Sequence, residues 1–341
     1  MRITTNAILR NYKSNLATSL TNLDSARTKV MTGRKFNSVS EDPANALRAS
    51  LLEKKYAKND DYLSTVKDAQ SFLDAQEDSA MQINSITLNL SKNYGLEALN
   101  GTNGSLDTRK TYAAAWKGAQ ESLMLSLNAT YDGKYVYAGS DSYEIPFKWD
   151  KDTNTLTYRG FDVSDPANKA SLDALADEKL YVDLGFGLDV TSANAAGDAP
   201  LKVGETSAFD IALPGIEVIG YGVDDNGDPK NMIALAGMIA EELEKEDFDY
   251  DRYSQLLEAF DAGRSNVLEK VTNLGTKTEF LTTTKERLET NEISIATQYD
   301  KVVNVDMAEA IMNFSWAQYA YNAALKVGNN ILTPSFIDFM N

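Results

Sequence analysis

The sequence predicts a mainly α-helical protein with a β-rich insert, in which long N- and C-terminal helices pair as a coiled coil or bundle. Apolar residues recur every seven positions near both ends of the chain, at 9–30 and 281–331. Between them, residues 131–230 are divided into short β-prone runs by glycine and proline. With 341 residues, the chain is too long for one ordinary core and has room for several domains.

The N-terminal arm, residues 1–38, is expected to be a helix with one apolar seam. The seam consists of two rows with seven-residue spacing, Leu9, Leu16, Leu23 and Val30 in one and Tyr12, Ser19 and Ala26 in the other. Such an a/d pattern requires a partner helix, and the small residues allow a close approach. Gly33 is placed to end the helix as its C-cap.

Two helical segments, residues 39–130 and 231–303, are expected to pair as an antiparallel rod. Ser40 or Asp42 can cap a helix that starts at Pro43, because proline is tolerated in the first helical turn. The second segment carries a strict seven-residue row, formed by Leu281, Leu288, Ile295 and Val302. If the two segments pair, both terminal arms lie at the same end of the rod.

The middle segment, residues 131–230, is expected to form a β-rich outer domain. Residues 147–160 fit a hairpin, with aromatic and β-branched flanks around a polar turn, and short strands are expected within 181–222. Residues 141–250 hold 24 acidic and 8 basic side chains and account for nearly all of the net charge of −17. The basic residues 1–35 are interpreted as a helix surface that meets acidic neighbours, so no nucleic-acid partner is expected.

The C-terminal arm, residues 304–341, is expected to be a helix that ends before Pro334 and continues into an apolar tail. Its seam has one row of large residues and one row that is mostly alanine: Met307, Phe314 and Tyr321, then Ala310, Ala317, Ala324 and Ile331. The aromatic residues near 316–321 are interpreted as packing residues. Two paired helices leave apolar residues without partners, so the arms are expected to be loose in a monomer and to order in an assembly.

The seven-residue rows and the apolar tail predict an assembly interface on the two arms and the tail. Its residues are Leu9, Tyr12, Leu16, Leu23, Val30, Met307, Phe314, Tyr321, Ile331, Leu332, Phe336, Ile337 and Phe339. The alternative is an intramolecular coiled coil that only closes the fold.

An enzyme is not expected from the composition. Cysteine and histidine are both absent, which removes thiolate nucleophiles, imidazole bases and Cys/His zinc sites. Two stretches imitate the start of a calcium loop, Asp150–Asn154 and Asp224–Asp228, but both lack the rest of the pattern and are interpreted as polar turns. We expect no catalytic residue, cofactor, metal, transmembrane span or cleavable signal peptide.

Three segments resemble the bacterial flagellin superfamily, and within it the hook-associated proteins of the hook–filament junction. They are TGRKFNSVSEDPANALRA (32–49), YDGKYVYAGSDSYEIPF (131–147) and NVDMAEAIMNFSWAQYAYNAALKVGNNILTPSFIDFM (304–340). The resemblance implies a flagellin-like fold and an extracellular structural protein of the flagellum, exported through the flagellar type III apparatus. It also implies a ring of subunits whose terminal helices assemble as coiled coils.

The partners that the resemblance implies are further copies of the chain, hook-associated protein 1, flagellin, the filament cap and an export chaperone. Two alternatives stay open at this point. The first is a flagellin that forms the filament itself. The second, from another class, is an exported ligand-binding protein or adhesin that uses the β-rich insert.

Overall fold

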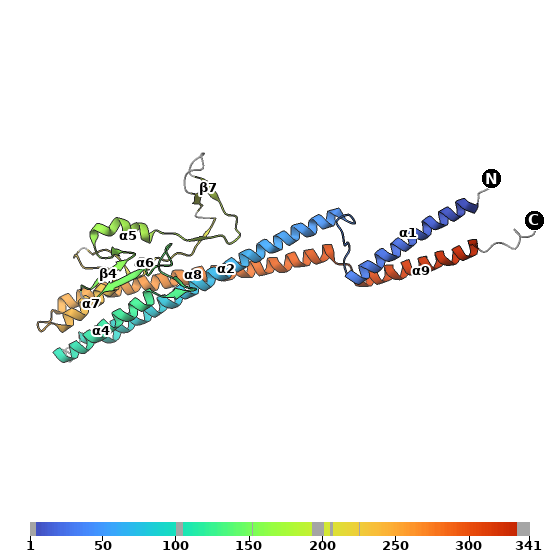
Figure 1. The fold of residues 1–341 in the computed structure, drawn as a ribbon. Helices are drawn as coiled ribbons and strands as arrows, with labels where there is room; N and C mark the ends of the chain where they lie inside the picture. Colours follow the sequence, from blue (N-terminus) through green and yellow to red (C-terminus); the bar gives the residue numbers. More distant parts are fainter. Residues whose placement is uncertain are drawn as a thin grey trace, which may run out of the picture. The chain divides into compact units, whose positions relative to one another are not determined.

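The computed structural model describes residues 5–99, 105–151, 153–192, 201–204, 207–224 and 226–332. It is mainly helical, with short strands in the middle of the chain (Figure 1). The chain divides into two compact units. One comprises residues 1–60 and 290–341, and is called here the terminal unit; the other comprises residues 61–289, and is called here the central unit.

The terminal unit is built from two helix pairs. Helix α1 (Thr5–Thr32) lies beside helix α9 (Met307–Leu332), which brings the two ends of the sequence together (Figure 1). The other two helices are the first part of α2 (Pro43–Asn89) and the last part of α8 (Tyr250–Val303). Tyr56 of α2 donates a hydrogen bond to Glu292 of α8 at 2.7 Å, and Tyr299 of α8 donates one to Glu53 of α2 at 2.8 Å.

Local sequence signals set the ends of these helices. Gly33 follows α1 with a φ of +68°, and its N–H donates to the carbonyl of Lys29 at 2.9 Å. A positive φ favours glycine, which is why the helix ends there. At the start of α2, Asp42 Oδ1 accepts from the N–H of Asn45 at 3.0 Å, and at the start of α9 the Asp306 carboxylate accepts from the N–H of Ala308 at 2.9 Å.

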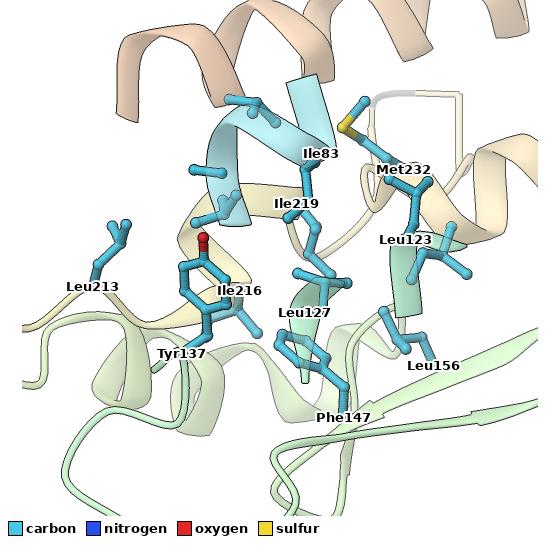
Figure 2. Packing of buried hydrophobic residues seen from close by; sticks show 14 of the residues in the cluster. Ile83, Leu123, Leu127, Tyr137, Phe147, Leu156, Leu213, Ile216, Ile219 and Met232 are labelled. Carbon is cyan, nitrogen blue, oxygen red and sulfur yellow. The ribbon is translucent and has the colours of Figure 1, made fainter. Parts of the chain in front are cut away.

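The central unit contains the main apolar core. Helix α4 (Leu106–Leu127) packs against α7 (Met232–Glu244), and Trp116 of α4 meets Phe260 of α8 edge to face, with ring centroids 4.8 Å apart. Figure 2 shows Ile83, Leu123, Leu127 and Ile219 converging on one another inside this core. Near the end of α2 the helix widens into a π-helical turn, η1 (Leu90–Gly95), which is followed by the short helix α3 (Leu96–Ala98).

The strands of the central unit are short and form small antiparallel sheets. The sheets are β1 (Thr130–Tyr131) with β2 (Lys134–Tyr135), β3 (Phe147–Asp150) with β4 (Thr155–Tyr158) and β5 (Phe161–Asp162), β6 (Tyr181–Val182) with β9 (Phe209–Asp210), and β7 (Val190–Ser192) with β8 (Leu201–Val203). The β3–β4 pair confirms the hairpin expected in residues 147–160.

Part of the insert is helical where strands were expected. Residues Gly215–Ile219 form helix α6, and the short helices η3 (Pro166–Asn168) and α5 (Lys169–Ala176) precede it. The expectation of a strand at GIEVI was wrong, although its β-branched residues favour one. Ile216, Val218 and Ile219 are all buried, so packing on the core, which sequence propensity does not report, selects the helix.

Candidate assembly interface

The predicted seam of α1 faces α9. Leu9, Leu16, Leu23 and Val30 are partly buried, and so are Tyr12, Ser19 and Ala26 of the second row. The residues directly beside them along most of the helix are exposed. Burial therefore follows the seven-residue pattern read from the sequence, and this apolar stripe is used within the chain.

The seam of α9 agrees with the prediction over most of its described length. Ala310 and Gly328 are buried, and the residues between them that face α1 are partly buried: Phe314, Ala317, Tyr321 and Ala324. Met307 is 45% exposed, so this member of the predicted row contributes less to the pair. Small residues dominate the α9 side, which allows the two helices to lie close together.

Five of the predicted interface residues have side chains that lie outside the described set. Phe336, Ile337 and Phe339 lie outside the described residues, as does Pro334. Ile331 and Leu332 belong to the last turn of α9, but their side chains are outside the described set. Their part in an interface between molecules stays a prediction.

A second apolar surface lies on the opposite side of α9, where the seven-residue pattern does not predict one. Ile311, Met312, Trp316 and Tyr319 are exposed, with Trp316 at 71% and Tyr319 at 74%. Together with Ala308 and Ser315 they line a shallow groove of about 250 Å³. We call these four exposed residues the outer face of α9.

The outer face of α9 has the spacing of one helical stripe. Its members follow at intervals of one, three and four residues, so they share a side of the helix. Tyr321 is partly buried and packs within the chain, whereas Trp316 and Tyr319 are exposed, so for these two residues a packing role stays a prediction. The signal that could have found the face is the absence of charge, because residues 310–325 include no Asp, Glu, Lys or Arg.

An uncharged apolar stripe of this kind is unusual on a surface that meets only water. An exposed helix normally carries charged side chains opposite its buried stripe, and clustered apolar surface marks sites of association. The outer face of α9 can therefore associate with another apolar surface by burying its apolar and aromatic side chains. Trp and Tyr are the residue types that contribute most where such surfaces meet.

The second of the two calcium-like stretches, Asp224–Asp228, has a structural role in the central unit. Asp224 Oδ1 accepts from the N–H groups of Asn226 and Asp228, at 2.9 and 2.7 Å, which closes a turn. The Asp228 carboxylate is held by both terminal nitrogens of Arg252, each at 2.6 Å. No group of three or more acidic residues suited to a metal ion occurs among the described residues. Helices long and apolar enough to span a bilayer are also not found in that part of the chain.

The arrangement of a paired N- and C-terminal helix, long helices and a small strand-containing insert defines a flagellin-like fold. Residues 3–142 match the family model described as the bacterial flagellin N-terminal helical region. This match covers the first of the three resembling segments and most of the second, and so confirms the resemblance seen in the sequence. A search of curated proteins found no match.

Two solved structures have the same fold over most of the chain. A flagellar hook-associated protein from Vibrio parahaemolyticus is 17% identical and superposes with a TM-score of 0.57, over 77% of this chain and 100% of that one. FlgL of Bacillus cereus is 13% identical with a TM-score of 0.51, over 73% of this chain and 99% of that one. These two likenesses show the fold, and the family model adds a match to the N-terminal helical region of bacterial flagellin.

Proposed function

We propose that this protein is an extracellular structural component of the bacterial flagellum that forms the junction ring between hook and filament. In this proposal, the terminal helices of neighbouring copies pack against one another as coiled coils. The arms, residues 1–38 and 304–341, form the inner assembly region, and residues 39–130 and 231–303 form the rod. Residues 131–230 form the outer domain. The function is mechanical and needs no catalytic group or cofactor.

The outer face of α9 is the observation that carries the proposal. The seam between α1 and α9 accounts for one side of each helix, and the uncharged residues on the other side of α9 have no cover within the described chain. A helix with apolar stripes on opposite sides belongs in a bundle of more than two helices. Further copies of the same chain can supply the additional helices through repeated contacts around a ring.

Two similar structures and one sequence motif favour the junction over the filament. The protein from Vibrio parahaemolyticus is described as a flagellar hook-associated protein. The protein from Bacillus cereus is described as FlgL. Residues 131–147 resemble the hook-associated branch, and they form the β1–β2 hairpin and the approach to β3. The proposed partners are hook-associated protein 1 on one side, and flagellin and the filament cap on the other. The partners proposed for the chain before assembly are an export chaperone and the type III export apparatus.

The position of the protein along the flagellum tests this proposal. The chain has no cysteine, so Asp141→Cys, at an exposed position in the insert, provides a single site for maleimide-linked gold. Electron microscopy of flagella is expected to show gold in one band where the filament meets the hook. The unsubstituted chain, treated in the same way, measures background labelling.

Other patterns of labelling would contradict the proposal in different ways. Gold along the whole filament, with abundance equal to the major subunit, would favour the flagellin alternative. If flagella carried no gold although the protein was exported, a structural role would be excluded, and the ligand-binding alternative for the insert would be favoured.

A further inference from the structure

The two segments that interrupt the helices of the terminal unit are hydrogen-bonded to each other. Residues 33–42 connect α1 to α2, and residues 304–306 connect α8 to α9. The N–H of Lys35 donates to the carbonyl of Val303 at 2.7 Å, and the N–H of Val305 donates to the carbonyl of Gly33 at 2.9 Å. These two bonds make an antiparallel bridge centred on Arg34 and Asn304.

Polar side chains line much of the space beside the bridge. A cavity of about 570 Å³ lies between α1, α9 and the two connectors, and most of its lining is polar or charged. Asn22, Ser25 and Lys29 line it from α1, and Glu309 and Asn313 line it from α9. At this end of the pair, the backbone bridge therefore adds a direct link between the two helices beside Val303 and Ala310, which are buried.

The geometry points to the two connectors acting as a single joint, so that α1 and α9 order and reorient together rather than separately. A rotation of the backbone in either connector breaks both hydrogen bonds, because each connector supplies one donor and one acceptor. Gly33, with its φ of +68°, places its carbonyl in the bridge in a conformation that other residues rarely adopt.

Coupling of this kind changes the cost of ordering the terminal helices. Each helix alone must lose its conformational entropy against few contacts. The bridge joins the end of α1 to the start of α9, so ordering one helix holds the adjoining end of the other close by, and the second helix orders at a lower entropic cost. The inference concerns the free chain and stands or falls separately from the proposed place in the flagellum.

A cysteine pair across the bridge tests the coupling directly. Arg34 and Asn304 form a non-hydrogen-bonded antiparallel pair, for which the Cα atoms lie about 4.5 Å apart, within the range of roughly 4.4–6.8 Å that a disulfide spans. The chain contains no other cysteine. In dilute Arg34→Cys/Asn304→Cys protein we expect one intramolecular disulfide and at least threefold slower amide exchange in both α1 and α9.

The matched control is Ser38→Cys/Asn304→Cys, which uses the same two connectors away from the bridge. It is expected to form little disulfide under the same oxidation conditions. Failure of the bridge pair to oxidise would overturn the inference. So would oxidation that slows exchange in only one of the two helices.

A proline substitution provides an independent test. Lys35→Pro removes the N–H that bonds to Val303, and Lys35→Ala removes the side chain but keeps that N–H. Coupling predicts at least threefold faster exchange in α9 for the proline variant, although the substitution lies in the connector of α1. The alanine variant loses only the hydrogen bond from Lys35 Nζ to the carbonyl of Lys301, so its exchange in α9 is expected to accelerate less than that of the proline variant. Unchanged exchange in α9 of Lys35→Pro, with residues 61–289 exchanging normally, would overturn the inference.

Discussion

The ring of Tyr12 occupies the place that a side chain at residue 328 would need. Gly328 of α9 is buried against α1, and a Cβ atom added to it would lie 1.9 Å from Tyr12 Oη and 2.2 Å from Cζ. Tyr12 Oη also donates a hydrogen bond to the carbonyl of Ala324, at 3.2 Å. This fit fixes the register of the two helices, since sliding either one by a turn would place Tyr12 against a residue that has a side chain.

We predict that Gly328→Ala loosens the terminal helix pair. The added methyl group must displace Tyr12, and overpacking of this kind costs about 1–3 kcal/mol. Amide exchange is expected to accelerate in α1 and α9 but not in residues 61–289. The expected loss exceeds the helix-propensity gain of about 1 kcal/mol that alanine has over glycine.

Gly118→Ala is the matched control for Gly328→Ala. Gly118 also lies inside a helix, α4, but it is exposed, and a Cβ atom there would have no neighbour within 4 Å. This substitution is expected to stabilise the central unit by about 0.4–1 kcal/mol, measured by urea denaturation. If both glycine substitutions stabilised the chain, the close fit of Tyr12 on Gly328 would be wrong.

Asn154 is expected to be the most sensitive position of the β3–β4 hairpin. It adopts a φ of +51°, its Nδ2 donates to the carbonyl of Ala234 at 3.1 Å, and its Oδ1 accepts from Gln120 at 3.1 Å. Asn154→Ala removes both hydrogen bonds, although Gln120 keeps its bond to the carbonyl of Ile233, and it places alanine in the left-handed region. We expect a loss of about 2–4 kcal/mol in the unfolding free energy of the central unit.

Asn154→Gly separates the two contributions, because glycine keeps the backbone conformation and loses only the hydrogen bonds. It is expected to cost about 1 kcal/mol less than the alanine variant. If Asn154→Ala and Asn154→Gly lowered the unfolding free energy by the same amount, backbone strain would play no part.

Glu178 is expected to make the central unit sensitive to acid. Burial alone would raise the pKa of its carboxyl, but hydrogen bonds from Ser140 and from Arg159, at 2.8–2.9 Å, hold that pKa below its usual range. Because the pKa is lower in the folded state, the stabilisation is present above the unfolded pKa and is lost as pH falls through the folded pKa.

We therefore expect Glu178→Gln to lower the unfolding free energy by about 1–2 kcal/mol at pH 7, a value reduced for the partial exposure of the group. The difference from the unsubstituted chain should shrink as the pH falls through the lowered folded-state pKa of Glu178. Glu121→Gln is the control. Glu121 and Lys151 form an ion pair in which both side chains are exposed, so this pair should contribute less than about 0.5 kcal/mol to the unfolding free energy. If Glu178→Gln lowered the unfolding free energy by the same amount at every pH, the shape of the side chain and not its charge would be responsible.

The helical part of the fold could be predicted from the sequence because its signals are periodic or local. The row from Leu9 to Val30, the cap at Asp42 and the glycine at position 33 all have the predicted roles in the structure. The insert was harder to predict, because GIEVI becomes a helix through burial on a core formed by residues distant in sequence. A short apolar run does not distinguish a strand from a buried helix.

The candidate interface was predicted only in part, for a related reason. A seven-residue pattern finds the side of a helix that packs, and on α9 this is the side that faces α1. Trp316 and Tyr319 lie on the other side, where periodicity gives no indication of whether a partner exists. Only the pairing of α1 with α9 shows that these aromatic residues have no cover within the described chain.

Hydroxyl-radical footprinting of free protein and intact flagella tests the central claim most directly. In the free chain Trp316, Tyr319 and Tyr143 are similarly exposed, at 71%, 74% and 75%, so oxidation of all three is expected. In flagella we expect at least fivefold protection of Trp316 and Tyr319, with Tyr143 of the insert still oxidised as in the free protein. Equal oxidation of Trp316 and Tyr319 in both states would contradict assembly through the outer face of α9.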